Sequence, residues 1–430
     1  MRMKWTVGFI LCFFLFDGSG LAQGSKELLT LEESIKIALE RSLKLHSATE
    51  GIVGSEFRQK AAKTDFLPKW TGEYGYTRYN SLTSIGDSGK SRDLSNFNTS
   101  IKQPLYSGGS ITSNYRLEKL GVDLSKTNTE VVKRDIVLEV REGYFNILRA
   151  EKFLSVSQQA VKQFEAQLEV TKAFFEVGIV AKNDVLQAEV RLANARQGLV
   201  KAENDLAVAK SYFNTLLRRE INAPLDVVDI LEYKPFVLLT EECIEEALQK
   251  RPEIKTAELN IDQAKESVKI ARSGFFPTIN LTGAYNRLSE EPGLMGDIRS
   301  ERWSVQALAT FTLWDWRKIA YKVGESKVKV TQAEDSKVQL LEGITLEVKQ
   351  DYLNMVQSEK NIGVAEKAIE QAEENLRMNE ERYKYQVATA TDVLDAVTLL
   401  AQARMNYYTA LSDFNIAKAR LERAMGRMYP

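Results

Sequence analysis

The sequence predicts a mainly α-helical chain with a small β part, built as a tandem duplication. Two long stretches, Ser110–Val177 and Lys318–Tyr385, are rich in helix-forming residues, poor in glycine and free of proline. Four short segments alternate apolar and polar residues, as half-buried strands do. Short motifs recur along the chain at a spacing of 208 or 209 residues. These observations indicate two copies of one unit, each with long helices and a pair of strands.

Residues 1–22 have the features of a secretory signal peptide. Two basic residues are followed by the apolar run Val7–Phe16 and by a small-x-small cleavage site that ends at Ala22. The apolar run is too short to span a bilayer core of about 30 Å. No small residue directly precedes Cys12, so we expect no lipidation there.

The mature chain has a nearly balanced charge. The whole sequence carries a formal net charge of −1, and loss of residues 1–22 removes two cations and one anion. The remaining charge of −2 argues against nucleic acid as a partner, because such a partner needs a strongly basic surface. Cys243 is the one cysteine left, which excludes an intramolecular disulfide, and we expect it on the apolar side of a helix.

Residue types that carry catalysis or bind cofactors are scarce. His46 is the single histidine, so a histidine-based metal site or a His-dependent catalytic triad is not expected. The sequence shows no nucleophile–base pair, no metal-ligand cluster and no phosphate-binding glycine loop. We therefore expect no enzyme, no metal site and no cofactor. No stretch after the signal peptide approaches the ~18 apolar residues of a membrane helix.

The same motifs occur in both halves at almost constant spacing. The matched motifs are Glu-Glu openings at 32 and 241, FLP at 66 and FFP at 275, and DVL at 184 and 392. We place the first repeat at residues 27–219, a linker at 220–236 and the second repeat at 237–428. So regular a series of matches over nearly 200 residues indicates duplication rather than chance.

Each repeat is expected to follow the same order of elements. A short amphipathic helix leads into a helix that ends before Pro68 or Pro277, because proline forces its predecessor towards extended geometry. Two strands, a long helix, a break and a return helix follow. The predicted ranges are 69–79, 94–104, 110–177 and 184–217 in the first repeat, and 278–287, 302–314, 318–385 and 392–425 in the second.

The long helices have the pattern of a coiled coil. Apolar residues recur at three- and four-residue steps, as at Leu341, Ile344 and Val348. At ~1.5 Å per residue each helix would extend about 100 Å, which is too long for a compact domain. On the helices alone, a solvated structural coiled coil explains the pattern equally well.

The strands favour a membrane protein. In Thr278–Tyr285 the residues Ile279 and Leu281 lie on one face and threonine and asparagine on the other. Segments of about ten residues with one polar face and aromatic ends suit the wall of a transmembrane β-barrel. A soluble antiparallel sheet is the alternative; the export signal and the lack of a second sheet argue against it. The expected membrane-interface aromatics are Trp70, Tyr79, Trp303 and Trp314.

The chain is expected to oligomerise, because four strands cannot close a barrel and an open edge in lipid would leave backbone groups unpaired. The polar loops Asn80–Asp93 and Leu288–Glu301 would face outwards and the helices would lie in the periplasm. A dimer would give eight strands with a filled interior, and a trimer would give twelve with a lumen. We favour the trimer, because the polar strand faces suit a wet channel.

The chain resembles the TolC-type outer-membrane efflux proteins over essentially all of its mature sequence. The features that carry the resemblance are the LTLEESIKIAL and LTEECIEEAL openings, FLP and FFP, PLYSGG and TLWDWRK at the returns from strand to helix, and the two DVL turns. The resemblance implies a homotrimer with a 12-stranded barrel in the lipid of a Gram-negative outer membrane and a 12-helix periplasmic barrel. The implied function is a passive exit duct of a tripartite efflux or secretion system. A periplasmic adaptor would connect it to an energised inner-membrane transporter that exports drugs, metal ions or proteins.

The resemblance also implies roles for the two breaks in the helices. The turns would form the periplasmic tips that contact the adaptor, with Val177, Gly178, Ile179 and Asp184 at the first tip and Gln386 and Val387 at the second. Gln386 stands where glycine is usual. Because of that difference, neither a left-handed residue at the second turn nor identical adaptor contacts at both tips can be assumed.

Asp392 and Asp395 match the acidic pair that rings the closed entrance in the family, and Tyr383 matches a tyrosine that latches it. Ala388 stands where some members have the latch arginine, so that bond is expected to be missing. From their spacing alone, Asp184 and Asp392 read as the N-caps of the return helices. Three-fold symmetry would set six carboxylates around one axis, which favours cations. We expect adaptor docking to depend on Gly178 and entrance control on Asp392 and Asp395.

Two other classes of protein share part of this pattern. A periplasmic adaptor would show one helical hairpin between two halves of a glycine-rich lipoyl-like domain, whereas this chain shows two hairpins. A structural coiled-coil surface protein would not need alternating strands with aromatic ends. The combination of both features in each repeat favours the duct.

Overall fold

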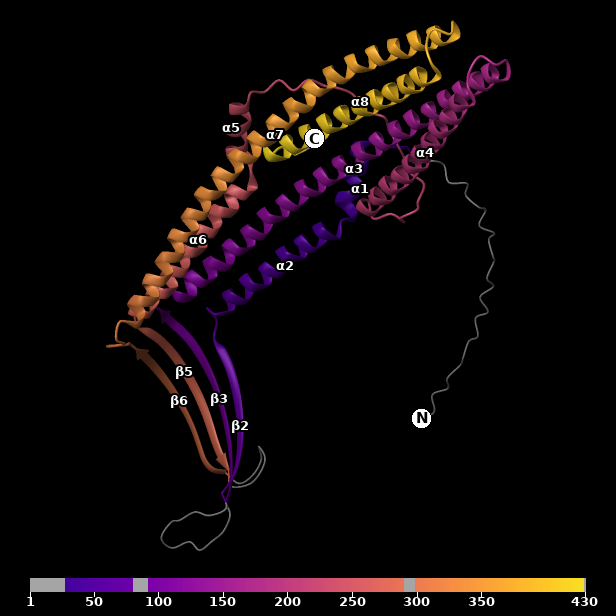
Figure 1. The fold of residues 1–430 in the computed structure, drawn as a ribbon. Helices are drawn as coiled ribbons and strands as arrows, with labels where there is room; N and C mark the ends of the chain where they lie inside the picture. Colours follow the sequence, from indigo (N-terminus) through magenta and orange to yellow (C-terminus); the bar gives the residue numbers. More distant parts are fainter. Residues whose placement is uncertain (1–27, 80–91, 290–297, 429–430) are drawn as a thin grey trace, which may run out of the picture.

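The computed structural model describes residues 28–79, 92–289 and 298–428 (Figure 1). The predicted signal peptide, Cys12, and most of the two predicted outer loops lie outside these residues. Strands gather at one end of the molecule, and helices extend from them to the other end (Figure 1). Among the described helices, none is both long and apolar enough to cross a membrane.

The two repeats contain the same succession of elements. The first has β1 (Leu28–Leu29), α1 (Leu31–Arg41), α2 (Leu43–Thr64), β2 (Lys69–Tyr79), β3 (Arg92–Ser107), α3 (Ser110–Glu176) and α4 (Lys182–Leu216). The second, with the linker strand, has β4 (Asp226–Val227), α5 (Thr240–Lys250), α6 (Pro252–Arg272), η1 (Ser273–Phe275), β5 (Thr278–Ser289), β6 (Ile298–Thr310), α7 (Lys318–Lys384) and α8 (Ala390–Ala424). Strand β3 is longer at both ends than predicted, and both return helices begin two residues earlier.

The duplication is more complete in the backbone than in the sequence. The described residues with left-handed backbone form four pairs, each 208 residues apart. The pairs are Gly108 with Trp316, Gly109 with Arg317, Gly178 with Gln386, and Arg218 with Gly426. Left-handed geometry is easiest for glycine, yet each pair has a glycine in only one of the two repeats. The fold therefore imposes the same corners on both repeats, whichever residue occupies them.

The strands form one antiparallel sheet in the order β2-β3-β5-β6. Its register sets Trp70 opposite Ile101, Ile101 opposite Gly283, and Gly283 opposite Val305. Residues directly opposite each other share a face, so the apolar faces of all four strands coincide. The apolar face carries Trp70, Tyr74, Phe97, Ile101, Leu281, Tyr285, Trp303 and Val305, and the other carries Thr71, Glu73, Asn98, Ser100, Thr282, Asn286, Ser304 and Gln306.

The prediction that Trp314 lies in a strand is wrong. Strand β6 ends at Thr310, and Trp314 belongs to the turn before α7. Its ring packs edge-on against that of Trp316, with the ring centroids 5.7 Å apart. The strand ends at Thr310 because the opposite residue, Thr278, is the first residue of its partner β5. Trp70 and Trp303 lie on the exposed apolar face, and Tyr79 is the last residue of β2.

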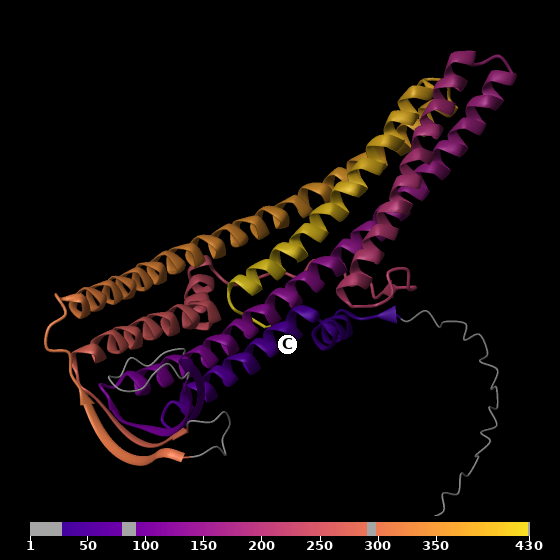
Figure 2. The same ribbon diagram turned by 90° about the horizontal axis from the view of Figure 1, so that it is seen from below.

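The helices change partners halfway along the molecule. Near the sheet they pack side by side in the order α2-α3-α6-α7, and towards the far end in the order α4-α3-α8-α7. Helices α3 and α7 contain 67 residues each and run through both halves, about 100 Å at ~1.5 Å per residue (Figures 1 and 2). As predicted, Cys243 is fully buried as a small apolar residue, in a cluster with Ile344 and Phe414. Burial raises the pKa of its thiol.

The linker ties the start of the chain to the middle of the bundle. Strand β4 pairs in parallel with β1. The buried Tyr144 of α3 donates its hydroxyl proton to the carbonyl of Val228, 2.8 Å away, and that hydroxyl also lies 3.1 Å from the carbonyl of Leu29. Burial raises the pKa of Tyr144 to about 12, so the phenol stays neutral. This contact fixes the linker against the point at which the helices change partners.

A network of ion pairs joins four helices close to that level. The buried Arg251, between α5 and α6, bonds to Glu253 at 2.8 Å and to Glu347 of α7. Arg423 of α8 bonds to Asp135 of α3 at 2.8 Å and to Glu347 at 2.9 Å. Asp351 lies one turn from Glu347 on α7, and burial together with the charge of Glu347 raises its pKa to about 6.

We expect Asp351→Asn to stabilise the protein at pH 8 and much less at pH 4.5. A carboxyl whose pKa is raised on folding binds its proton more tightly in the folded state, so stability falls as the pH rises from about 4 to about 6. The amide removes that loss, and because the site is partly solvated the gain should be no more than ~1 kcal/mol. Thermal unfolding of the solubilised protein, followed by circular dichroism at both pH values, measures it. An equal shift at both pH values would contradict the assignment.

Candidate functional site: the tips of the helical hairpins

The end of the molecule opposite the sheet consists of two helix–turn–helix tips. Helices α3 and α4 meet at one tip and α7 and α8 at the other, and the two tips lie side by side in both views (Figures 1 and 2). A shared apolar cluster holds the two hairpins together. Its buried members include Leu168 of α3, Leu192 of α4, Leu376 of α7, and Leu394 and Leu400 of α8.

The two turns have the same backbone conformation. At the first, Gly178 has a φ of 78° and its N–H donates to Phe175, while Ile179 donates to Phe174. At the second, Gln386 has a φ of 58°, and it and Val387 make the equivalent bonds, at 3.0 and 2.8 Å. Both are Schellman caps, in which a left-handed residue satisfies the last helical carbonyls. The question raised by Gln386 is thus answered, because glutamine adopts the left-handed turn.

Both tips expose apolar side chains. Val177 and Val387 are 70% and 66% exposed, and Ile179 and Tyr385 are also exposed. Beside them a groove of about 430 Å³ runs between the first turns of α4 and α8. It is lined by Asn183, Leu186, Gln187, Val190, Arg191, Asn194, Thr391 and Leu394.

Asp184 and Asp392 are not N-caps, contrary to the prediction. The caps are Ala181 and Thr389, and the aspartates occupy the third helical position. The carboxylate of Asp392 accepts from the N–H and the hydroxyl of Thr389, both at 2.8 Å, and these bonds lower its pKa. Asp184 accepts in the same way from the N–H of Ala181 at 3.2 Å. This is the capping-box position, which explains why the helices begin two residues earlier than expected.

Tyr383 connects the two hairpins inside one chain. It is 3% exposed, its hydroxyl donates to Thr171 of α3 at 3.3 Å, and its ring lies 5.3 Å from that of Phe174. Burial raises the pKa of this hydroxyl. The tyrosine therefore fixes α7 against α3 just behind the turns.

Asp395 has a partner that the sequence did not reveal. Nη2 of Arg191 on α4 lies 2.7 Å from Oδ1 of Asp395 on α8. One turn nearer the tip, Thr391 donates its hydroxyl proton to Gln187 at 2.8 Å. The available signal was an asymmetry between the repeats, because the counterparts of Asp395 and Arg191 at a spacing of 208 are uncharged.

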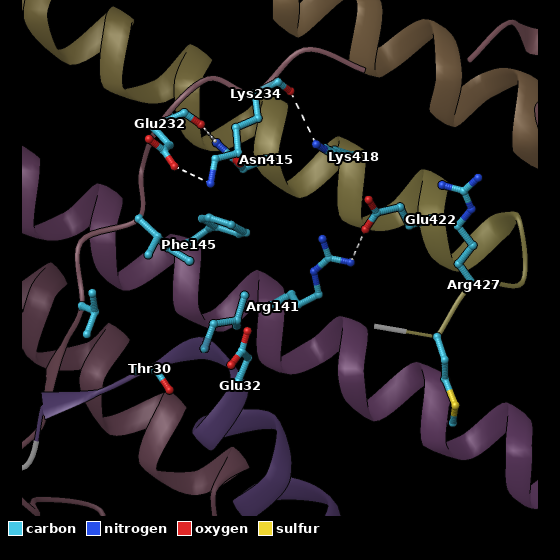
Figure 3. Close-up of a pocket in the computed structure, with 14 residues that line it drawn as sticks. Thr30, Glu32, Arg141, Phe145, Glu232, Lys234, Asn415, Lys418, Glu422 and Arg427 are labelled. Atoms are coloured by element: carbon cyan, nitrogen blue, oxygen red, sulfur yellow. Dashed lines mark hydrogen bonds and ion pairs between the residues drawn. The ribbon is translucent and has the colours of Figure 1, made fainter. Parts of the chain in front are cut away.

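The pocket in Figure 3 has a structural explanation. It has a volume of about 590 Å³ and lies where the linker crosses α3 and α8. The charges around it bond across the pocket walls: Arg141 donates to Glu422 at 2.6 Å, and Asn415 donates to the carbonyl of Glu232 at 3.1 Å (Figure 3). The first bond joins α3 to α8, and the second holds the linker on α8. In the part of the chain that the structure describes, no group of three or more His, Cys, Asp or Glu is placed to hold a metal ion.

Comparison with known proteins decides the family. A sequence profile of the outer membrane efflux protein family matches residues 34–217 and again residues 243–427. The chain belongs to this family. The two matched stretches fall one in each repeat.

Relatives of known name support the family assignment. The chain is similar to the outer membrane protein TolC of Vibrio cholerae serotype O1, with 26% identity over 383 residues, 86% of this chain and 84% of that protein. It is also similar to TolC of Escherichia coli K12, with 23% identity over 331 residues, 73% of this chain and 65% of that protein. A crystal structure of CusC superposes with a TM-score of 0.81 at 17% identity, covering 93% of this chain and 92% of that one.

The family and the fold together identify the kind of protein. The chain is an outer-membrane efflux channel with a TolC-like fold, mainly α-helical with a small β part, as predicted. The family is one of channels. The tips described above lie at the end of this efflux protein farthest from its sheet.

We expect Gln386→Gly to stabilise the second tip. A left-handed side-chain-bearing residue costs roughly 1–2 kcal/mol, part of which glycine loses again through the greater freedom of the unfolded chain. Amide exchange at Val387, whose N–H closes the turn, should slow about fivefold. The matched change Gly178→Ala should speed exchange at Ile179. Faster exchange at Val387 in Gln386→Gly would contradict the shared turn geometry.

Proposed function

We propose that three copies of the chain close into a single duct that carries substrates out through the outer membrane. The observation that supports this proposal most strongly is that both the sheet and the helical layers of a single copy have two unpartnered edges. In the sheet, β2 and β6 each pair on one side only among the described residues. The helical layers are likewise bounded by α2 or α4 on one side and by α7 on the other.

The open edges of the helical layers carry apolar stripes. On α7 the exposed residues Leu346, Leu353 and Val364 follow one another at steps of seven and eleven, which keeps them on one face of a helix. On α4, Val190 and Val208 are exposed as well, and their spacing of eighteen residues keeps them on one face of the helix. Stripes of this kind suit a contact between α7 of one copy and α4 of the next. The contact is heterologous and closes into a ring.

The polar face of the sheet supports three copies over two. Eight strands form a barrel whose interior side chains fill, whereas twelve leave a lumen. The residues of that face, including Thr71, Asn98, Ser100 and Gln306, are suited to line water. Trp70 and Trp303 would then stand near the membrane interfaces, together with Trp314 from the turn before α7. The position of Tyr79 alternates with those of Trp70 and Tyr74 along β2 and so belongs to the polar face, which does not favour the expected interface role for Tyr79.

The tips would dock a periplasmic adaptor that leads to an energised inner-membrane transporter. Val177, Ile179 and Val387 offer exposed apolar contacts, and the groove between α4 and α8 lies beside them. Gly178 and Gln386 give the two turns the same backbone conformation. The two tips would therefore present the adaptor with different side chains on the same backbone. Asp184 supports the first turn as a capping residue. The duct itself would be passive.

The entrance would be formed by the second hairpin. Asp392 and Asp395 lie on one exposed stripe of α8, at the end of the molecule where three hairpins would meet. Tyr383 would hold that hairpin against the first one through Thr171. Opening would require the two hairpins to separate at this contact.

The double variant Leu353→Glu/Val364→Glu tests the trimer. Both side chains would be buried between subunits, where an unpaired carboxylate costs several kcal/mol. We expect the mass of the detergent-solubilised protein, measured by light scattering, to fall from three copies to one while its helical circular dichroism persists. Asn354→Glu, an exposed site about 100° further round the same helix, serves as the matched control and should leave the trimer intact. A double variant that remains trimeric would overturn the proposed assembly.

A further inference from the structure

We propose that Arg191 sets the charge of the entrance by neutralising Asp395, so that the assembled duct presents three uncompensated carboxylates there instead of six. Arg191 thereby becomes a selectivity-determining residue for the transported ions. This inference rests on the proposed trimer and on the position of its entrance.

The geometry makes the compensation specific. Arg191 and Asp395 are joined at 2.7 Å, and their side chains are 42% and 55% exposed, so the pair faces solvent. The helices that carry them are held together by buried Leu192 and Leu394 and by the bond from Thr391 to Gln187. The pair therefore belongs to a fixed seam between α4 and α8.

Asp392 has no such compensation. Its carboxylate accepts from the N–H and hydroxyl of Thr389, which are neutral donors, and no ion pair reaches it within the described residues. Arg382 contributes only a weaker attraction from farther away. The hydrogen bonds favour the ionised form, so Asp392 remains charged at neutral pH.

The pair occurs once in each chain. At the positions 208 residues away, Asp395 corresponds to Gln187 and Arg191 to Leu399, which is 57% exposed. In the trimer, the contact between α8 of one copy and α4 of the next would therefore hold a leucine and a glutamine at these positions. Each ring of three subunits thus contains three arginine–aspartate pairs and three lone Asp392 carboxylates.

The sign of the charge effect follows directly. A lone carboxylate attracts cations over about a Debye length, ~10 Å at 0.1 M salt, whereas a compensated pair acts only at short range. Removing Arg191 would expose three more carboxylates on the same ring. With attraction between charges about 10 Å apart and partly screened by salt, this should raise the preference for K⁺ over Cl⁻ about two- to threefold.

The test is the reversal potential of single channels in planar bilayers under a KCl gradient, with the purified trimer. We expect Arg191→Gln to raise the K⁺/Cl⁻ permeability ratio about two- to threefold, Arg191→Lys to leave it near the wild-type value, and Arg191→Gln/Asp395→Asn to restore the wild-type value. Asp395→Asn alone, which leaves Arg191 without its partner, should shift the ratio towards Cl⁻.

An Arg191→Gln trimer with an unchanged ratio, together with a reduced ratio in Asp392→Asn, would overturn the role of Arg191 and leave the duct in place. A wild-type protein that is monomeric or forms no pore would overturn the proposed function and this inference with it.

Discussion

The backbone hydrogen bonds at the two edges of the sheet constrain everything else in this molecule. Strands β2 and β6 each satisfy one side of their backbone within the described chain, and in lipid each unpaired group would cost several kcal/mol. The outermost helices of each layer also lack a packing partner on one side, since α2 or α4 lies at one edge and α7 at the other. In the proposed assembly, one ring of identical copies would pair the strand edges and cover the apolar residues of α4 and α7 together. The sheet, the long helices and the tips would then all depend on that one ring.

Duplication explains which features the sequence could predict. The spacing of 208 residues located both hairpins, the strand pairs and the turns, because hydrophobic period and proline positions are local signals. The left-handed conformation of Gln386, Trp316 and Arg317 could not be predicted, because these residue types rarely adopt a positive φ. At these positions the packed helices and strands on either side determine the turn, and they override the local preference of the residue.

In the candidate site, too, some residues could be chosen from the sequence and others could not. Asp392, Asp395 and Tyr383 could be chosen from a family resemblance, and the structure places all three at one end of the molecule. Arg191 could not, because its ion pair with Asp395 depends on how α4 and α8 lie in space, over 204 positions of sequence. The cap was placed three residues too late, at Asp392 instead of Thr389, since aspartate is favoured both as a cap and three residues after one. In the proposed duct, the charge at the entrance would therefore depend on the contact between the two hairpins rather than on α8 alone.

Closure of the sheet can be measured by hydrogen–deuterium exchange of the native protein in outer-membrane vesicles, followed strand by strand. If neighbouring copies complete the barrel, the amides of β2 and β6 exchange as slowly as those of the inner strands β3 and β5. Edge strands that exchange orders of magnitude faster than the inner strands would show that the sheet remains open, and would contradict the account.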